Sequence, residues 1–97
     1  MKGTILRGKL LVLLSNVYPD AMEQTSIIGI YYQLNKVDDI HAELAYLVDK
    51  GYIIKKETPH PFKENKTVVY YKISPKGIDL CEGNIQADPG IILQVEG

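Results

Sequence analysis

The side chains of this sequence best suited to catalysis or metal binding are two histidines and one cysteine, His41, His60 and Cys81. An activated nucleophile needs a base and an orienting partner. The motifs that signal such sites, HExxH, GxSxG, CxxC and the phosphate-binding loop of nucleotide hydrolases, do not occur here. A zinc site made of all three would need distant segments to converge. We therefore expect a protein that is not an enzyme and holds no metal and no cofactor. In it His41 is exposed on a helix, His60 lies in a loop, and Cys81 is a small buried apolar side chain.

Lysines form the second chemically distinctive group. Residues 52–76 carry six lysines against two glutamates, whereas residues 36–50 carry two lysines against four acidic residues. Lysine ammonium groups bind nucleic-acid phosphates and release their counterions. The candidate phosphate-contacting residues are Lys55, Lys56, Lys63, Lys66 and Lys72, and Lys2, Arg7 and Lys9 add positive charge near the start of the chain. An open alternative is that the lysines only protect a solvated strand edge from pairing with other chains.

The composition limits the class of protein. Ninety-seven residues fit one domain, and 45% hydrophobic with 24% charged residues is typical of a globular chain. The net charge of −1 gives no overall basicity. A single cysteine excludes an internal disulfide and fits a reducing cytoplasm. The apolar run at residues 10–14 is too short for a signal peptide or a membrane span. We expect a cytoplasmic protein that does not enter a membrane.

Hydrophobic spacing predicts three helices in the first half of the chain. The first has its apolar residues on one face and ends before Pro19; they are Leu6, Leu10, Leu13, Leu14 and Val17. The second begins after an N-cap at Asp20 and buries a stripe of Ile27, Ile30, Tyr31 and Leu34. The third follows an N-cap at Asn35 and stops at Gly51. Its apolar face consists of Val37, Ile40, Leu44, Leu47 and Val48.

The second half predicts a hairpin and a fourth helix. Residues 52–57 and 67–74 are rich in β-branched and aromatic side chains and read as strands, joined by a loop that holds Pro59 and Pro61. Ser74 and Pro75 are typical of a helix start, and Gly83 of its end. We predict a domain at residues 1–83 and a tail at residues 84–97. The apolar run at residues 91–95 could pair as a strand, dock on a partner or be partly disordered.

This order of elements resembles the winged helix-turn-helix superfamily. Two segments carry the resemblance: ELAYLVDKGYI at residues 43–53, like a recognition helix entering a wing, and YYKISPKGIDLCEG at residues 70–83, like the last wing strand and the closing helix. The chain is similar to small uncharacterised winged-helix proteins of Mu-like phages and prophages, in which a Pro-Gly tail also follows a short fourth helix. The expected fold is α+β, with a three-helix core, a two-stranded hairpin wing and a short fourth helix.

The resemblance implies a DNA-binding transcription regulator that dimerises through its first helix and tail. Its third helix would lie in the major groove of duplex DNA and its wing along the backbone. The groove-facing residues carried over by position are Asp38, Asp39, His41, Ala42, Ala45 and Tyr46. These depart from the Arg, Lys, Asn and Gln that usually read bases, although acids in a first turn also complement the helix dipole. The alternatives are a protein-interaction module that does not bind DNA, because its acidic helix meets a basic partner, and a phage assembly accessory.

Overall fold

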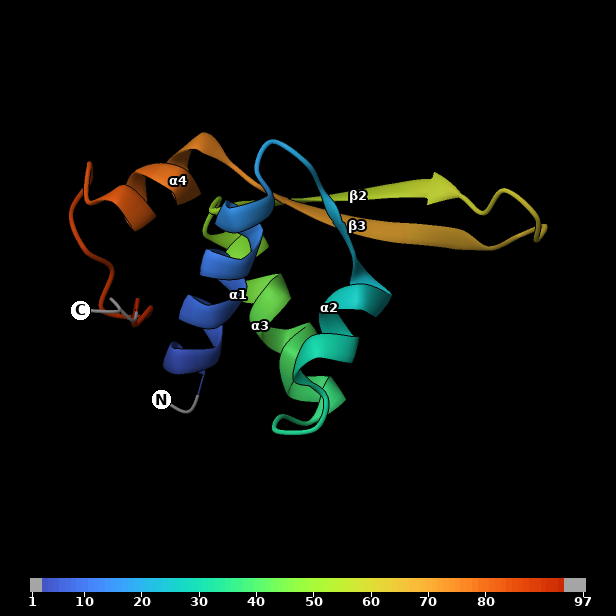
Figure 1. Ribbon diagram of the computed structural model, residues 1–97, viewed down its shortest axis with the longest axis horizontal. Coiled ribbons are helices and arrows are strands. Elements are labelled where there is room, and N and C mark those ends of the chain that lie inside the picture. The colour runs from blue at the N-terminus through green and yellow to red at the C-terminus, as the bar shows by residue number, and fades with distance from the viewer. Residues whose placement is uncertain (1–2, 94–97) are drawn as a thin grey trace.

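The computed structural model describes residues 3–93. In these residues four helices and three strands follow one another as α1 (Thr4–Val17), β1 (Met22–Glu23), α2 (Gln24–Tyr31), α3 (Val37–Asp49), β2 (Ile53–Pro59), β3 (Thr67–Ile73) and α4 (Pro75–Glu82). The helices gather at one end, and the β2–β3 hairpin projects beyond them (Figure 1). The molecule is therefore elongated, with extents of 44 × 27 × 24 Å.

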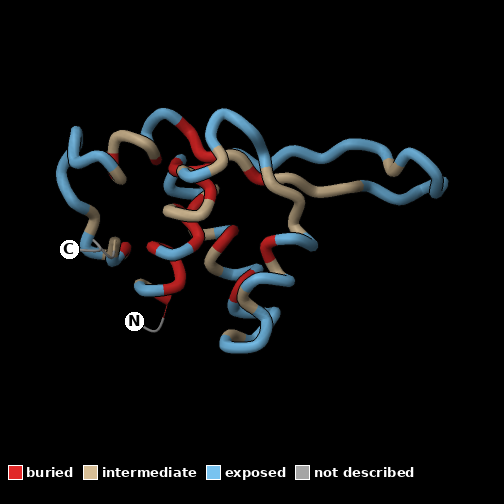
Figure 2. The backbone as a smooth tube through the Cα atoms, in the orientation of Figure 1, coloured by how far each residue is buried: buried red, intermediate tan, exposed pale blue. Residues whose placement is uncertain are grey.

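The core lies between the helices and the base of the hairpin, whereas the projecting part of the hairpin is mostly exposed (Figure 2). The apolar faces predicted for the first and third helices are largely confirmed, but Val37 is a correction, because at the start of α3 it is 43% exposed. The apolar side chains of these two helices that are buried are Leu6, Leu10, Leu11, Leu14, Ile40, Leu44 and Leu47. Tyr71 and Ile73 close the core from the inner face of β3. Burial of these side chains is the main stabilising contribution.

The stripe predicted for the second helix is half right, since Ile27 and Tyr31 pack into or against the core but Ile30 and Leu34 do not. Ile27 is buried, but Ile30 is 51% exposed and Leu34 is 89% exposed. The helix begins at Gln24 because the two residues before it pair with β3, and it ends at Tyr31. Leu34 therefore lies in the turn after the helix, where the 3.6-residue period no longer directs it toward the core.

Two predicted N-caps are corrected, and one is confirmed. The N-cap of α2 is Glu23 instead of Asp20, and that of α3 is Lys36 instead of Asn35. Asn35 instead donates from Nδ2 to the carbonyl of Tyr31, 3.2 Å away, at the end of α2. Ser74 caps α4 as predicted, because its Oγ accepts from the Gly77 N–H at 3.1 Å.

The sheet has three strands in the order β1-β3-β2, all antiparallel. The prediction of two strands is corrected by β1, which pairs Met22 with Tyr71 and Glu23 with Tyr70. Pro59 ends β2 and does not lie in the loop. An edge strand tolerates a residue without an N–H, and β2 is an edge strand.

The tail returns to the helices after α4. Asp88 and Gly90 form a turn, Ile91 is buried, and the Ile92 N–H donates to the Thr4 carbonyl at 3.0 Å. Residues 88–93, called the C-terminal strap below, therefore dock on their own domain. No strand is formed at residues 91–93, and the rest of the predicted run, residues 94 and 95, lies outside the described residues.

Candidate nucleic-acid interface

The predicted phosphate-contacting lysines all lie on the hairpin. Lys55, Lys56, Lys63 and Lys66 are exposed, and Lys72 is half-buried. Directly paired residues of antiparallel strands share a face. Lys55 is paired with Tyr71, whereas Lys56 is paired with Tyr70 on the other face. The positive charge therefore surrounds the hairpin and does not mark one side of it.

Lys72 differs from the other lysines of the hairpin. It pairs with Ile54 near the base, and its Nζ lies 5.8 Å from the centre of the Tyr18 ring. A cation over an aromatic face gains about 0.5–1 kcal/mol at an exposed site. We expect Lys72 to be a weaker phosphate contact than the four exposed lysines, because its ammonium group would have to leave the Tyr18 ring to bind a phosphate.

The tip of the hairpin is organised by His60. Its ring Nδ1 accepts from the backbone N–H groups of Phe62 and Lys63, each at 3.1 Å, and the backbone N–H of His60 donates to the Lys66 carbonyl at 2.8 Å. The imidazole thus shapes the loop, as predicted for a loop residue. It also fixes the backbone from which Lys63 and Lys66 extend.

A hollow of about 450 Å³ lies between the start of α2 and the hairpin. It is lined by Glu23, Gln24, Thr25, His60, Pro61, Phe62, Thr67, Val68, Val69 and Tyr70. Glu23 accepts from the Thr25 hydroxyl at 2.7 Å and brings negative charge to the hollow. This carboxylate in the wall of the hollow therefore disfavours a bound phosphate there.

The outward side of α3 is acidic. Asp38, Asp39, His41, Ala42 and Ala45 are exposed, and their contact with DNA or a partner stays a prediction. Between Val37 and Asp49 the helix has no Arg, Lys, Asn or Gln. This face thus lacks the side chains that most often hydrogen-bond to base edges.

Tyr46 does not belong to that face and is a correction to the predicted set. The Arg7 guanidinium carbon lies 3.6 Å from the centre of its ring, and its hydroxyl lies against Gly90 of the strap. The helical period places Tyr46 on the flank of α3 that Glu43 shares, toward α1. It is therefore half-buried against its own chain.

Arg7 is also corrected, because it is only 5% exposed and cannot reach a phosphate. Its Nε donates to Glu43 Oε1 at 2.6 Å, and its Nη1 donates to the Gly90 carbonyl at 3.0 Å. Sequence reasoning missed this cluster. The available signal was the position of Arg7 directly after Leu6, within the apolar face of the first helix.

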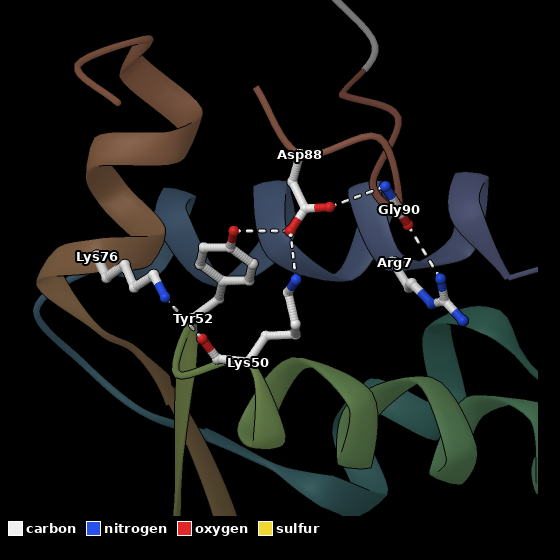
Figure 3. Close-up of polar contacts among 6 residues, drawn as sticks. All are labelled: Arg7, Lys50, Tyr52, Lys76, Asp88 and Gly90. Atoms are coloured by element: carbon white, nitrogen blue, oxygen red, sulfur yellow. Dashed lines mark hydrogen bonds and ion pairs between the residues drawn. The ribbon is translucent and has the colours of Figure 1, made fainter. Parts of the chain in front are cut away.

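A second polar cluster joins the end of α3 to the strap (Figure 3). Asp88 accepts from the Tyr52 hydroxyl at 2.7 Å, from the Gly90 N–H at 2.8 Å, and lies 3.1 Å from Lys50 Nζ. These donors lower the pKa of the Asp88 carboxyl below its ordinary value. Burial, together with the contact to Asp88, raises the pKa of Tyr52 to about 12. Lys76 completes the cluster by donating to the Lys50 carbonyl at 3.1 Å.

The histidines and the cysteine are not brought together. Within residues 3–93, no three His, Cys, Asp or Glu side chains form a group that could hold a metal ion. Cys81 is half-buried against the core, and burial raises the pKa of its thiol, which lowers its reactivity. In the same residues, no helix combines the length and the apolar character that crossing a membrane requires.

Comparison with known proteins identifies the fold. The chain matches no protein-family model and no curated protein. It is similar to the crystal structure of Bacillus subtilis PadR in complex with operator DNA, with a TM-score of 0.65 and 22% sequence identity. The similarity covers 98% of this chain and 54% of the PadR chain, so this chain spans about half the length of that protein. The predicted α+β fold is confirmed, and the chain has a winged-helix fold.

Proposed function

We propose that this protein is a non-enzymatic DNA-binding regulator that holds duplex DNA mainly through its hairpin. The observation that carries the proposal is the projecting hairpin with four exposed lysines, Lys55, Lys56, Lys63 and Lys66. The similarity in fold to a protein solved with operator DNA supports it. Because these lysines lie on both faces of the projecting hairpin, they can contact phosphates whichever face of the hairpin is turned toward the DNA.

The third helix would contribute little affinity in this arrangement. Asp38 and Asp39 would be repelled by phosphates, although a carboxylate can accept from a cytosine amino group. Ala42 and Ala45 could contact thymine methyl groups, and His41 is the remaining side chain that could bind a base edge. We therefore propose binding that depends strongly on salt and weakly on base sequence.

The remaining features of the proposal come from the resemblance. A homodimer would match two half-sites on the duplex. The strap covers α1 at Gly8, but Ile5 is 46% exposed, so we propose that dimerisation uses the Ile5 side of α1. A cytoplasmic location and an origin in a phage or prophage are part of the same proposal.

The test is fluorescence anisotropy of a labelled duplex of random sequence, titrated with protein at several salt concentrations. We expect binding at low salt that weakens steeply as salt rises, because each neutralised phosphate releases counterions. Absence of binding even at low salt would reject the proposal. It would favour the alternative of a protein-interaction module that does not bind DNA, for which the acidic α3 is the supporting observation.

A further inference from the structure

The corner between α2 and α3 exposes four large apolar side chains. Ile30, Tyr32, Leu34 and Val37, called the corner patch below, are 51%, 54%, 89% and 43% exposed. All four lie within eight consecutive residues, and Tyr32 and Leu34 line one shallow hollow of about 280 Å³ together with Gln33, Asn35 and Lys36. Single exposed apolar residues are ordinary, but four within one short stretch at a corner of the fold indicate a candidate interaction site.

The corner patch is presented on an ordered turn. The N–H groups of Leu34 and Asn35 both donate to the Tyr31 carbonyl, at 3.2 and 3.0 Å, and the Asn35 side chain donates to the same oxygen. Tyr31 is itself held by its hydroxyl, which donates to the Lys9 carbonyl at 3.2 Å. Because the turn is already ordered, binding of a partner would not lose free energy to the conformational entropy of ordering it.

The charge beside the corner patch indicates what kind of partner fits. Asp38 and Asp39, in the first turn of α3, are exposed next to Val37 and outnumber the neighbouring Lys36. A partner with an apolar anchor flanked by lysines or arginines would match both the apolar centre and the acidic rim. Duplex DNA matches neither, because its phosphates are negative and its surface offers few apolar groups.

We propose that the corner patch is the docking site for a protein partner that presents a basic amphipathic helix. The apolar residues of that helix would cover Leu34 and Ile30, and its cations would lie beside Asp38 and Asp39. The inference does not rest on DNA binding. The hairpin tip and the α2–α3 corner lie at different extremities of the molecule (Figure 1), so the protein could use them for different partners.

The test is titration of the isotope-labelled protein, followed by amide NMR signals, with a synthetic helical peptide of leucine and lysine that has leucine at helical spacing. A matched peptide with glutamate in place of lysine is the charge control. We expect saturable shifts confined to residues 30–39 with the lysine peptide and none with the glutamate peptide. Leu34→Ser should weaken binding about tenfold or more, as truncation of a central anchor does.

Two matched variants make the test specific. Phe62→Ser removes a side chain that is 91% exposed at the hairpin tip, and it should leave peptide binding unchanged. Asp38→Asn with Asp39→Asn should weaken binding, whereas Asp49→Asn, an exposed acid at the other end of α3, should not. Unchanged DNA affinity of Leu34→Ser would show that the two surfaces are separate.

Four results would overturn the inference. The first is equal binding of both peptides or of neither, and the second is peptide-induced shifts that map to the hairpin or the strap. The third is shifts of residues 30–39 on dilution of the protein alone, which would identify a second copy of this chain as the occupant. The fourth is shifts of the same residues with duplex DNA, which would make the corner part of the DNA surface.

Discussion

Arg7 and Glu43 join α1 to the flank of α3 through a contact of 2.6 Å between Nε and Oε1, with side chains only 6% and 15% exposed. The Arg7 guanidinium also covers the Tyr46 ring and donates to the strap at Gly90. One arginine therefore binds two helices and the tail together. Guanidinium groups suit such sites because several donors lie in one plane that can also stack on an aromatic ring.

Glu43→Ala should strongly destabilise the fold. It leaves the Arg7 charge buried without its carboxylate, and breaking a buried pair in this way costs about 3–5 kcal/mol. The free energy of unfolding, measured by urea denaturation, should fall by that amount. Glu64→Ala at the exposed hairpin tip is the control and should change the value by no more than about 0.5 kcal/mol. Equal effects of the two variants would contradict the role assigned to Arg7.

Gly8→Ala should destabilise the protein although alanine favours helices. A Cβ at position 8 would collide with the backbone carbonyl of Ile92, so the strap would have to move. Forcing an extra methyl into a packed site costs about 1–3 kcal/mol. The expected result is a lower free energy of unfolding and faster hydrogen exchange of the Ile92 amide, which donates to Thr4.

Gly29→Ala, on α2, should stabilise the protein, in contrast to Gly8→Ala. Nothing lies within 4 Å of a Cβ at this position. Replacing a helical glycine with alanine there should stabilise the fold by about 0.5–1 kcal/mol. If Gly8→Ala stabilised the protein as Gly29→Ala does, the strap would not be packed against α1 in solution.

Asp88 should make the protein less stable in acid. Its folded pKa is lowered below the ordinary value of 3.8, so its contribution to stability is fully present above that pH. The contribution is lost as the pH falls through the lower, folded value. The difference in unfolding free energy between the unsubstituted protein and Asp88→Asn should be constant at neutral pH and should shrink below 3.8.

The pKa of Asp88 can also be followed directly by NMR titration of its carboxyl. Tyr52→Phe removes the hydroxyl that donates to Asp88, and the pKa should then rise toward its ordinary value. Asp20→Asn is the matched control for loss of one carboxylate elsewhere. A stability difference for Asp88→Asn that persisted unchanged to the lowest pH would contradict the assignment.

The hairpin lysines should set the salt dependence of DNA binding. Removing Lys56 or Lys66 should weaken binding similarly for all sequences and reduce the slope of log K against log salt by about one unit each. Anisotropy titrations of Lys56→Ala and Lys66→Ala would measure this. Lys9→Ala, an exposed lysine on α1, is the control, and an equal loss of slope there would show that phosphate contact is not confined to the hairpin.

Local sequence patterns predicted the elements that have a regular apolar spacing over several turns or clear start and stop residues. Leu10 and Leu14 define α1, and Ser74 with Gly83 bounds α4. The strand β1 was not predictable because two residues show no period, and its pairing with β3 decides where α2 begins. Leu34 was misplaced for a different reason, because the apolar spacing continues beyond the end of α2 at Tyr31.

The polar clusters were beyond local patterns because their partners are far apart in the chain. Arg7 contacts Glu43 36 residues away, and Tyr52 contacts Asp88 at the same separation. The exposed position of Lys63 and Lys66 could be foreseen because they lie in the loop between two predicted strands, whereas the function of the hairpin lysines in binding DNA stays a prediction. Of the residues predicted to face a partner, Tyr46 was misassigned because its contact with Arg7, on a distant part of the chain, cannot be read from the neighbouring sequence.

The hydrogen bond from Arg7 to Gly90 spans 83 residues of the chain. During synthesis from the N-terminus, Arg7 is made well before Gly90, whose carbonyl accepts its hydrogen bond. Until then, the surface around Gly8 is uncovered. The entropy of closing so long a loop grows only slowly with length, by about 0.6 kcal/mol for each doubling. The order of synthesis, more than the thermodynamic cost, thus decides when the first helix reaches its final surroundings.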